Sequence, residues 1–344
     1  MRLQTTDYRP QTMKSVAEIG ENALIRQLSR LVPGRADVVA GIGDDCAVVR
    51  VGGRYDLLLK SDPVIERVHF SPGTPGERIG HKAVGRVLSD VAAMGGEPLW
   101  ILMDLVAPAK TAVRRIEALY RGAARLARRH GAAIVGGDTS RGPALELHVF
   151  AVGRVPRGKA VLRSGARVGD RVYVTGVLGG SLQGWHLRFP PRLAEGRWLR
   201  EGGWVTAMMD VSDGLAADLP RLAAASGVGV EVEADAIPVS PAARCADHRP
   251  QTKDIRRKKG GESPAAGARS GLAHALGDGE DFELVFTVPA CKSAAFEQAW
   301  RRKFRLRCSA IGWITGAKGR VRLREGDRIS ALDVAGYEHF RDRR

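Results

Sequence analysis

The sequence predicts a mixed α/β (α+β) protein with two domains. The chain has 344 residues, 44% of them hydrophobic, which is enough for two domains of ordinary size with a substantial core. Short apolar runs that are typical of strands alternate with stretches of helical spacing. Near residues 156–169 the chain becomes polar, basic and rich in glycine, which indicates a domain boundary. We therefore expect an N-terminal domain over residues 15–155 and a C-terminal α/β domain over residues 156–344.

The first half contains helices whose ends are marked by glycine or proline. Helical spacing predicts a helix over residues 16–31 that ends at residues 33–34, after a loose polar segment of residues 1–14. An apolar stripe predicts a second helix over residues 79–94, which the glycines at 95–96 end. The other elements expected in this half are strands over residues 55–59, 98–106, 132–135 and 145–155, and a helix over residues 111–130.

The second half continues the mixture of strands and helices. A strand over residues 171–175 leads into the glycine-rich loop 176–181, and a helix begins near Leu215 after an acidic segment. Residues 248–270 are charged, glycine-rich and aperiodic, which predicts a solvated insertion or linker. The remaining expected elements are strands over residues 228–232, 282–288 and 306–314 and a helix over residues 290–304.

The composition favours a cytoplasmic enzyme or binding protein. There is no unbroken apolar stretch of ~18 residues and no leader with a small-residue cleavage site, so neither a membrane partner nor export is expected. The four cysteines have no CxxC pairing and no nearby histidine spacing, which argues against a zinc site or a disulfide framework. They are Cys46, Cys245, Cys291 and Cys308.

The formal net charge of +16 raises the hypothesis of nucleic-acid binding. Much of the excess lies in short basic runs, such as residues 256–259, 301–303 and 341–344. Aromatic residues are not interleaved with these runs, as a base-stacking surface would require. We expect weak attraction to polyanions rather than a specific nucleic-acid partner.

Acidic residues recur where a strand or helix meets a turn. They are Asp44, Asp45, Asp62, Asp90, Asp138, Asp210 and Asp213. Two carboxylates ~4 Å apart repel each other by roughly 4 kcal/mol at an effective dielectric of 20, so a convergent cluster must be neutralised. These motifs show no cationic partners, which makes bound metal the simplest remedy. Oxygen ligands, with Ser61 as a possible hydroxyl, favour a hard ion such as magnesium, and magnesium suggests bound phosphates.

The alternative for any single one of these motifs is an ordinary turn. Residues 41–49 contain two glycines and two aspartates before an apolar run, and such residues are common in surface turns. Familiar phosphate-binding motifs do not occur: GxxxxGK[ST], GxGxxG after a strand and the protein-kinase set are all missing from the sequence. A nucleotide-using enzyme with this sequence must have another architecture.

Eight short motifs nevertheless occur in a recognisable order. They are GIGDDCAV (41–48), SDP (61–63), LSDVAAMG (88–95), GGDTSRGP (136–143), RSGARVGD (163–170), VTG (174–176), DVSDGL (210–215) and GEDFEL (279–284). Together they resemble the thiamine-monophosphate kinases, within the superfamily typified by aminoimidazole ribonucleotide synthetase. The resemblance covers residues 15–340.

This resemblance implies a two-domain aminoimidazole ribonucleotide synthetase-like fold whose N-terminal domain dimerises through its sheet. The implied reaction is ATP-dependent phosphorylation of thiamine monophosphate to thiamine diphosphate, with several magnesium ions. The implied metal ligands are Asp45, Ser61, Asp62, Asp90, Asp138, Asp210 and Asp213. The implied ATP contacts are Tyr120, Gly137, Asp138, Arg163 and Ser212, and the implied substrate contacts are His69 and Glu280. Phosphoryl transfer needs positioning and charge neutralisation more than a nucleophilic side chain, which suits an aspartate-rich site.

Plainer interpretations remain open for several of these residues. Tyr120 lies on a helical stripe and fits a core position, His69 fits an ordinary strand or loop, and Glu280 fits a turn. Val334 stands where the family tends to place an aromatic before a Gly-Tyr pair, so stacking on the substrate ring is lost or supplied elsewhere. Other members of the superfamily, which make aminoimidazole ribonucleotide, selenophosphate or a modified carbamoyl group, are the alternative enzymes. A basic nucleic-acid-binding protein is the alternative that is not an enzyme.

Overall fold

The computed structural model describes residues 15–246 and 270–332, and the chain divides into two compact units. The first unit contains the helices α1 (Val16–Ile19) and α2 (Glu21–Ser29). The single helix predicted over residues 16–31 is wrong, because Gly20 between the two helices has a φ of 75°, which helical residues do not adopt. Residues 1–14, nearly all of the predicted insertion 248–270 and Val334 lie outside the described residues.

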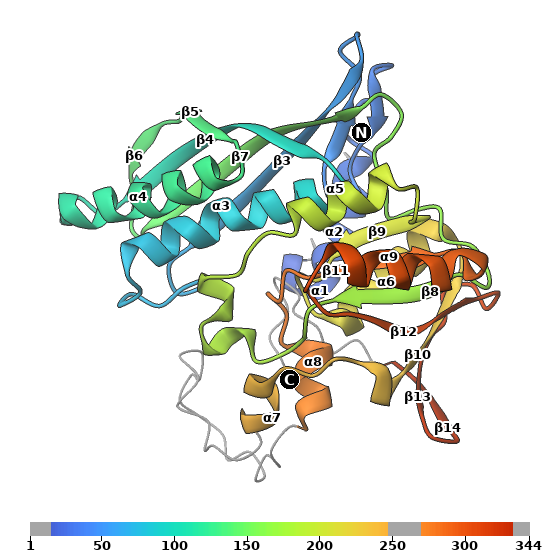
Figure 1. Cartoon of the computed structure of the whole chain (residues 1–344). Coiled ribbons are helices and arrows are strands. Elements are labelled where there is room, and N and C mark those ends of the chain that lie inside the picture. Colours follow the sequence, from blue (N-terminus) through green and yellow to red (C-terminus); the bar gives the residue numbers. More distant parts are fainter. Residues whose placement is uncertain (1–14, 247–269, 333–344) are drawn as a thin grey trace, which may run out of the picture. The chain divides into compact units, whose positions relative to one another are not determined.

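The second unit, residues 36–337, contains two seven-stranded sheets. The first sheet has the order β1-β2-β3-β7-β4-β5, with β6 also paired to β4. Its strands are β1 (Val38–Ala40), β2 (Ala47–Val49), β3 (Tyr55–Ile65), β4 (Glu97–Ala107), β5 (Ala133–Gly136), β6 (Thr139–Arg141) and β7 (Glu146–Pro156). The helices α3 (Gly76–Ala93) and α4 (Val113–Arg129) cover one face of this sheet (Figure 1). Apolar side chains of both layers form one buried core.

Two glycines let α3 and α4 pack closely against each other. A Cβ atom added at Gly80 would lie 1.9 Å from the carbonyl oxygen of Leu119, and one added at Gly122 would lie 2.0 Å from that of Glu77. Real Cβ atoms do not approach backbone oxygens so closely, so only glycine fits at these two crossing points. The close contact fixes α3, the helix that carries Lys82, Arg86 and Asp90 of the site described below.

Strand β3 is twice as long as the sequence predicted. Its pairing with β7 continues from Tyr55 opposite Pro156 to Ile65 opposite Glu146. Ser61 and Asp62 therefore lie inside the strand and not at its end, which corrects the expectation. Beyond Leu59 no strand of the described residues pairs with β3 on the β2 side, so Pro63 lies at an edge, where proline is tolerated.

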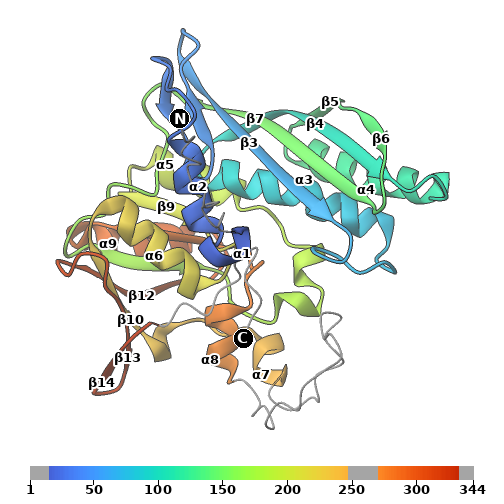
Figure 2. The same ribbon diagram turned by 180° about the vertical axis from the view of Figure 1, so that it is seen from behind.

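The other face of the first sheet is exposed and carries an apolar patch, and it faces the viewer in Figure 2. Side chains alternate along a strand, and those that point away from α3 and α4 include Leu59, Trp100, Leu102 and Phe150. Trp100 is 49% exposed, Leu102 45% and Phe150 39%. Leu102 pairs with Phe150, which pairs with Ser61, so these side chains form a continuous patch across three strands.

The second sheet has the order β14-β13-β10-β12-β8-β11-β9 and is covered on both faces. Its strands are β8 (Arg171–Thr175), β9 (Ala207–Asp210), β10 (Gly229–Glu233), β11 (Leu284–Val288), β12 (Cys308–Thr315), β13 (Val321–Glu325) and β14 (Arg328–Ala331). Helix α6 (Leu215–Ser226) packs on one face, and α9 (Ser293–Lys303) and α5 (Leu193–Glu201) pack on the other through an aromatic cluster (Figures 1 and 2). Ala93 at the end of α3 belongs to this aromatic cluster and links it to the first sheet.

Several elements of the second half were not predicted. These are β9, α5, α7 (Pro241–Ala246), α8 (Gly271–Gly277), the hairpin of β13 and β14, and the 3-10 turns η1 (Ser181–Gln183), η2 (Trp185–Leu187) and η3 (Ala234–Ala236). The helix predicted over residues 290–304 is the 3-10 turn η4 (Ala290–Lys292) followed by α9. The predicted start of β11 at Phe282 is also wrong, because Phe282 has a φ of 52° and the strand begins at Leu284. A backbone in that conformation does not continue a strand.

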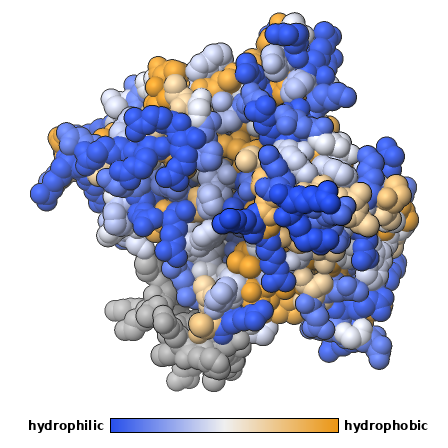
Figure 3. Space-filling model, in the orientation of Figure 1, coloured by the Kyte–Doolittle hydropathy of each residue, from blue (hydrophilic) through white to orange (hydrophobic). Residues whose placement is uncertain are grey.

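Polar and charged side chains cover most of one face of the molecule, and the cysteines are unpaired. The face in Figure 3 is largely hydrophilic, with hydrophobic residues in separate patches. No helix among the described residues is long and apolar enough to cross a membrane. All four cysteines are free.

Candidate active site

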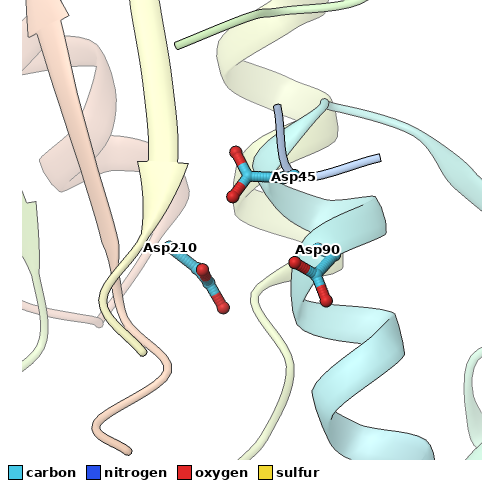
Figure 4. A group of neighbouring side chains, drawn as sticks. All are labelled: Asp45, Asp90 and Asp210. Carbon is cyan, nitrogen blue, oxygen red and sulfur yellow. The ribbon is translucent and has the colours of Figure 1, made fainter. Parts of the chain in front are cut away.

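Three buried aspartates from three different elements meet in one place. Asp45 lies in the turn before β2, Asp90 in the last turns of α3, and Asp210 at the end of β9. One carboxylate oxygen from each lies within 4.8 Å of the others. Figure 4 shows the three side chains pointing toward a shared space between the ribbons that supply them. The first sheet with its helix and the second sheet therefore build this cluster jointly.

Hydrogen bonds hold the acidic turn at Asp44 and the carboxylate of Asp210 in place. Asp44 accepts hydrogen bonds from the backbone N–H of Asp45 at 2.9 Å and from that of Arg163 at 3.2 Å, which ties the acidic turn to the chain before the second sheet. The hydroxyl of Ser89 donates to Asp210 at 2.6 Å, and Ser89 precedes Asp90 on α3. Asp44 thus holds the acidic turn in place through the backbone, whereas Asp45 points into the cluster.

Basic side chains accompany these carboxylates, which corrects the expectation that the acidic motifs have no cationic partners. Arg163 lies 2.7 Å from Asp45. The ammonium group of Lys60 lies 2.9 Å from Asp90 and 3.8 Å from Asp62. The guanidinium Nε of Arg86 lies 3.9 Å from Asp62. Strand β3 and helix α3 supply Lys60 and Arg86, and these cations come into reach only when the two elements pack together.

Burial dominates the protonation of the cluster in the metal-free protein. It raises the pKa of Asp210 to about 6, with a further rise from Asp45 and an opposing effect of the Ser89 hydrogen bond. It also raises the pKa of Asp90 well above its usual range, although Lys60 opposes the rise. Burial alone would lower the pKa of Lys60, but Asp90 and Asp62 more than reverse this, so its pKa lies above the ordinary value. The lysine therefore stays charged.

The cluster fits a hard divalent cation. The second carboxylate oxygen of Asp45 is buried and has no hydrogen-bond partner among residues 15–246 and 270–332, although an unpaired buried oxygen of this kind is costly. A cation beside Asp90 and Asp210 would satisfy this oxygen. The donors are all carboxylate oxygens, which magnesium prefers, and no sulfur or imidazole ligand of the described residues joins the group.

The other predicted metal ligands lie apart from these three. Asp62 is beside the cluster and linked to it through Lys60. Ser61 follows Lys60 on β3, so its side chain points to the opposite, exposed face of the sheet. Asp138 is exposed in the turn between β5 and β6. Asp213 forms an ion pair with Arg221.

Asp218 on α6 holds the loop that contains Ser212 and Asp213. Its carboxylate accepts hydrogen bonds from both backbone N–H groups at 3.0 Å and forms an ion pair with Arg221 at 2.7 Å. Asp218 is fully buried in the first turn of α6. Its place just after the DVSDGL motif, where a carboxylate favours a helix start, is a signal that sequence reasoning missed.

Three of the predicted nucleotide contacts gather at the middle of β4. The hydroxyl of Tyr120 donates to the backbone oxygen of Met103 at 3.5 Å, and the N–H of Asp138 donates to Asp104 at 2.8 Å. A Cβ added at Gly137 would lie 2.1 Å from that same Met103 oxygen, and Gly137 has a φ of 149°, so glycine is required there. Arg163 and Ser212, the other two predicted contacts, do not belong to this group.

The two predicted substrate contacts are joined by a buried lysine. Lys82 on α3 has no exposed side-chain surface, and its ammonium lies 2.6 Å from the backbone oxygen of His69 and 2.7 Å from Glu280. Glu280 has a φ of 55°, a strained conformation that is often found at functional sites. Sequence reasoning missed Lys82, although a lysine three residues after Ile79 falls on the buried stripe of the helix.

Comparison with known proteins identifies the family. The model of the AIR synthase related protein N-terminal domain matches residues 43–155, and that of the C-terminal domain matches residues 179–324. The thiamine-monophosphate kinase of Salmonella typhimurium is 33% identical over 93% of this chain and 98% of its own length. That of Rhodopirellula baltica is 35% identical over 92% of this chain and 95% of its own.

Solved structures agree with this result. The structure of AaThiL complexed with AMPPCP and TMP superposes with a TM-score of 0.77 at 28% identity and covers 96% of this chain and all of its own. Thiamine-monophosphate kinase from Stenotrophomonas maltophilia K279a has a TM-score of 0.68 at 32% identity and covers 89% of this chain and 96% of its own. This chain therefore belongs to the thiamine-monophosphate kinase family, within the AIR synthase related proteins.

Proposed function

We propose that this protein is a thiamine-monophosphate kinase that transfers the terminal phosphoryl group of ATP to the phosphate of thiamine monophosphate. The chain matches thiamine-monophosphate kinases over nearly their whole length. A structural neighbour binds AMPPCP, an ATP analogue, together with TMP. The observation that best supports the proposal is the buried cluster of Asp45, Asp90 and Asp210 with its unpaired carboxylate oxygen. Such a cluster is suited to phosphate chemistry that depends on a divalent cation.

In this reaction an oxygen of the acceptor phosphate attacks the γ-phosphorus of ATP. A new P–O bond forms, the bond between the γ-phosphorus and the bridging oxygen breaks, and ADP leaves with that oxygen. The attacking phosphate oxygen is already ionised near neutral pH, so no side chain needs to act as a nucleophile or base. The protein's contribution is to position the two phosphates and to balance their charge.

Asp45, Asp90 and Asp210 would hold magnesium, and Asp62, Asp138 and Asp213 are the further predicted ligands that remain, because the Ser61 side chain points to the opposite face of the sheet. When bound, magnesium neutralises charge on the phosphates. Under the proposed division at residues 155–156, the first domain supplies Asp45 and Asp90 and the second supplies Asp210. Both domains must be in place to complete the site.

The nucleotide would extend along the first sheet. Asp62 on β3 is opposite Val149 on β7, which is opposite Met103 on β4, so two strand spacings, roughly 10 Å, separate Asp62, beside the acidic cluster, from the group around Met103. An extended ligand such as ATP would reach both, with Tyr120, Gly137 and Asp138 at one end and Arg163 and Ser212 near the phosphates. Arg163 already lies beside Asp45, and its planar guanidinium suits phosphate oxygens.

The acceptor would bind at His69 and Glu280. Lys82 holds both from inside the protein, through the His69 backbone oxygen and the Glu280 carboxylate. A carboxylate in this position would attract the positively charged thiazolium ring of thiamine monophosphate.

We also propose that the protein is a homodimer that pairs through the exposed face of its first sheet. The apolar patch of Leu59, Trp100, Leu102 and Phe150 supports this assembly. Monomeric proteins seldom expose a continuous apolar surface of this kind.

The test is an assay of products in purified protein. ADP and thiamine diphosphate should form only when ATP, thiamine monophosphate and magnesium are all present. Asp45→Asn should lower turnover by at least ~10²-fold, whereas Asp235→Asn, an exposed aspartate in the 3-10 turn η3, should leave it unchanged. Absence of transfer to thiamine monophosphate, together with strong activity on another acceptor, would refute the assignment.

A further inference from the structure

Lys60 occupies an unusual position for a lysine at a metal-binding site. It lies on β3 with its side chain directed toward α3, and its ammonium is 2.9 Å from Asp90 and 3.8 Å from Asp62. The side chain is 21% exposed, and that of Asp90 is 8% exposed. The ammonium thus lies between two carboxylates, in a place where a metal ion would have the same neighbours.

The charges around the cluster are almost balanced without any metal. The carboxylates of Asp45, Asp62, Asp90 and Asp210 lie beside the cations Lys60, Arg86 and Arg163. These seven side chains together have a formal charge of one negative unit. A cluster with this balance does not need several divalent ions for its own neutralisation.

The balance is uneven across the cluster. On the Asp62 side, Lys60 and Arg86 both approach the carboxylate. On the Asp45 side, Arg163 contacts one carboxylate oxygen, and the other has no hydrogen-bond partner in the described structure. A divalent cation is therefore attracted to the unpaired Asp45 oxygen and repelled from the place that Lys60 fills.

We propose that Lys60 is a tethered cation that takes the place of one divalent ion between Asp62 and Asp90. Metal binding in this chain is then confined to the side of the cluster formed by Asp45, Asp90 and Asp210. The role in catalysis rests on the proposed metal-dependent phosphoryl transfer. The metal-binding consequence does not, because it can be measured without nucleotide or substrate.

The experiment counts bound Mn²⁺, a paramagnetic probe for magnesium sites, by electron paramagnetic resonance titration of the full-length protein. Lys60→Gln keeps a hydrogen-bonding group near Asp90 but removes the charge, and Lys60→Ala also removes the bulk. Both variants should bind one more Mn²⁺ per chain than wild type, or should bind Mn²⁺ at least ~10-fold more tightly, since a repelling charge is gone. Lys60→Arg, which keeps the charge, should behave as wild type.

Two controls separate this effect from general loss of charge or stability. Lys110→Ala removes an exposed lysine distant in sequence from the cluster and should leave the Mn²⁺ count unchanged. Asp62→Asn combined with Lys60→Gln removes a carboxylate along with the lysine and should return the count to that of wild type. Because Lys60→Ala leaves Asp90 without its ion pair, melting curves with and without Mn²⁺ accompany every titration. A larger Mn²⁺-induced rise in the melting temperature of either neutral variant supports the proposal.

An unchanged count and affinity in a folded Lys60→Gln protein would overturn the inference. Loss of phosphoryl transfer in that variant with no change in Mn²⁺ binding would also overturn it, because Lys60 would then act on phosphate and not in place of a metal. Failure of wild type to make thiamine diphosphate would instead contradict the proposed function and leave the Mn²⁺ comparison valid.

Discussion

At the scale of single residues, the site depends on carboxylates that are buried with few hydrogen bonds. Asp210 is ionised near neutral pH at a cost, since burial raises its pKa to about 6. In the unfolded chain the same carboxyl titrates near pH ~3.9. Between these two pH values the folded protein holds a proton that the unfolded chain has released, so the stability of the folded state falls as pH rises through this window.

Asp210→Asn tests this argument. In metal-free buffer the stability of wild type should fall relative to Asp210→Asn as pH rises from about 4 to about 6, and the difference should stay constant above that range. The variant should therefore melt at a higher temperature than wild type at pH 7, and magnesium should raise its melting temperature far less. Melting curves across pH, with chelator and with magnesium, measure both effects. A variant that melts below wild type at pH 7 without metal would contradict the prediction.

Lys82→Met tests the link between the predicted substrate contacts. The change removes the ammonium that holds Glu280 and the His69 backbone oxygen, so we expect the KM for thiamine monophosphate to rise at least ~10-fold and the affinity for an ATP analogue to stay near that of wild type. The free energy of unfolding should fall by about 1–3 kcal/mol, the usual cost of an unpaired buried polar group. Steady-state kinetics and denaturant unfolding measure these quantities. Lys292→Met, an exposed lysine bonded to the Gly203 backbone, is the control and should change neither. If the KM for thiamine monophosphate and the dissociation constant of the ATP analogue rose equally, the substitution would have disturbed the whole site and the prediction would fail.

Local residue patterns could predict the acidic positions but not their partners. The spacing of Asp45, Asp90 and Asp210 beside turns indicated a convergent cluster, and the structure brings these three together. Lys60 and Asp90 are 30 positions apart in the chain, and they pair only because β3 packs against α3. A local sequence pattern does not extend over that separation, so the sequence did not predict these cationic partners.

At the scale of elements, glycines determine how closely the chain approaches the predicted nucleotide site. Gly137→Ala would place a Cβ 2.1 Å from the Met103 backbone oxygen at a φ of 149°, so the turn between β5 and β6 must move. We expect the KM for ATP to rise at least ~10-fold, because Asp138 follows directly and moves with the turn.

Gly131→Ala is a matched control. Gly131 also has a positive φ, of 73°, but open space surrounds the position of the added Cβ. The Gly131→Ala substitution should lower the free energy of unfolding by only ~1 kcal/mol and leave the KM for ATP unchanged. The KM for ATP is compared between Gly137→Ala and Gly131→Ala. Similar values would show that the group around Met103 is not part of the nucleotide site.

Predictions of elements succeeded where periodicity was long and failed where tertiary contacts decide. The stripe of α3 and the apolar run of β7 were placed within a few residues of their observed ends. The length of β3 depends on its partner β7, and α5 is held by an aromatic cluster with α9, a contact between residues about 100 positions apart. Neither could be found from local composition.

At the scale of the whole molecule, the exposed sheet face predicts self-association. Light scattering should give twice the chain mass for wild type at micromolar concentration, and Trp100→Glu should give a monomer, because a charge in the centre of an apolar interface is costly to bury. Val168→Glu, at an exposed valine before the second sheet, is the control and should remain a dimer. A monomeric wild type, or a dimeric Trp100→Glu, would contradict the proposed interface.

Helix α3 connects the predicted acceptor residues with the acidic cluster. Lys82, Arg86 and Asp90 follow one another at intervals of four residues, so they lie on one side of the helix and the outer two are separated by roughly 12 Å along its axis. Lys82 contacts the predicted acceptor residues and Asp90 belongs to the acidic cluster. The helix therefore fixes the distance between the predicted acceptor site and the cluster that would bind the phosphates of the donor. Because this spacing is fixed, we expect transfer to an acceptor with one phosphate and none to thiamine diphosphate offered as the acceptor, which an assay of ADP release measures.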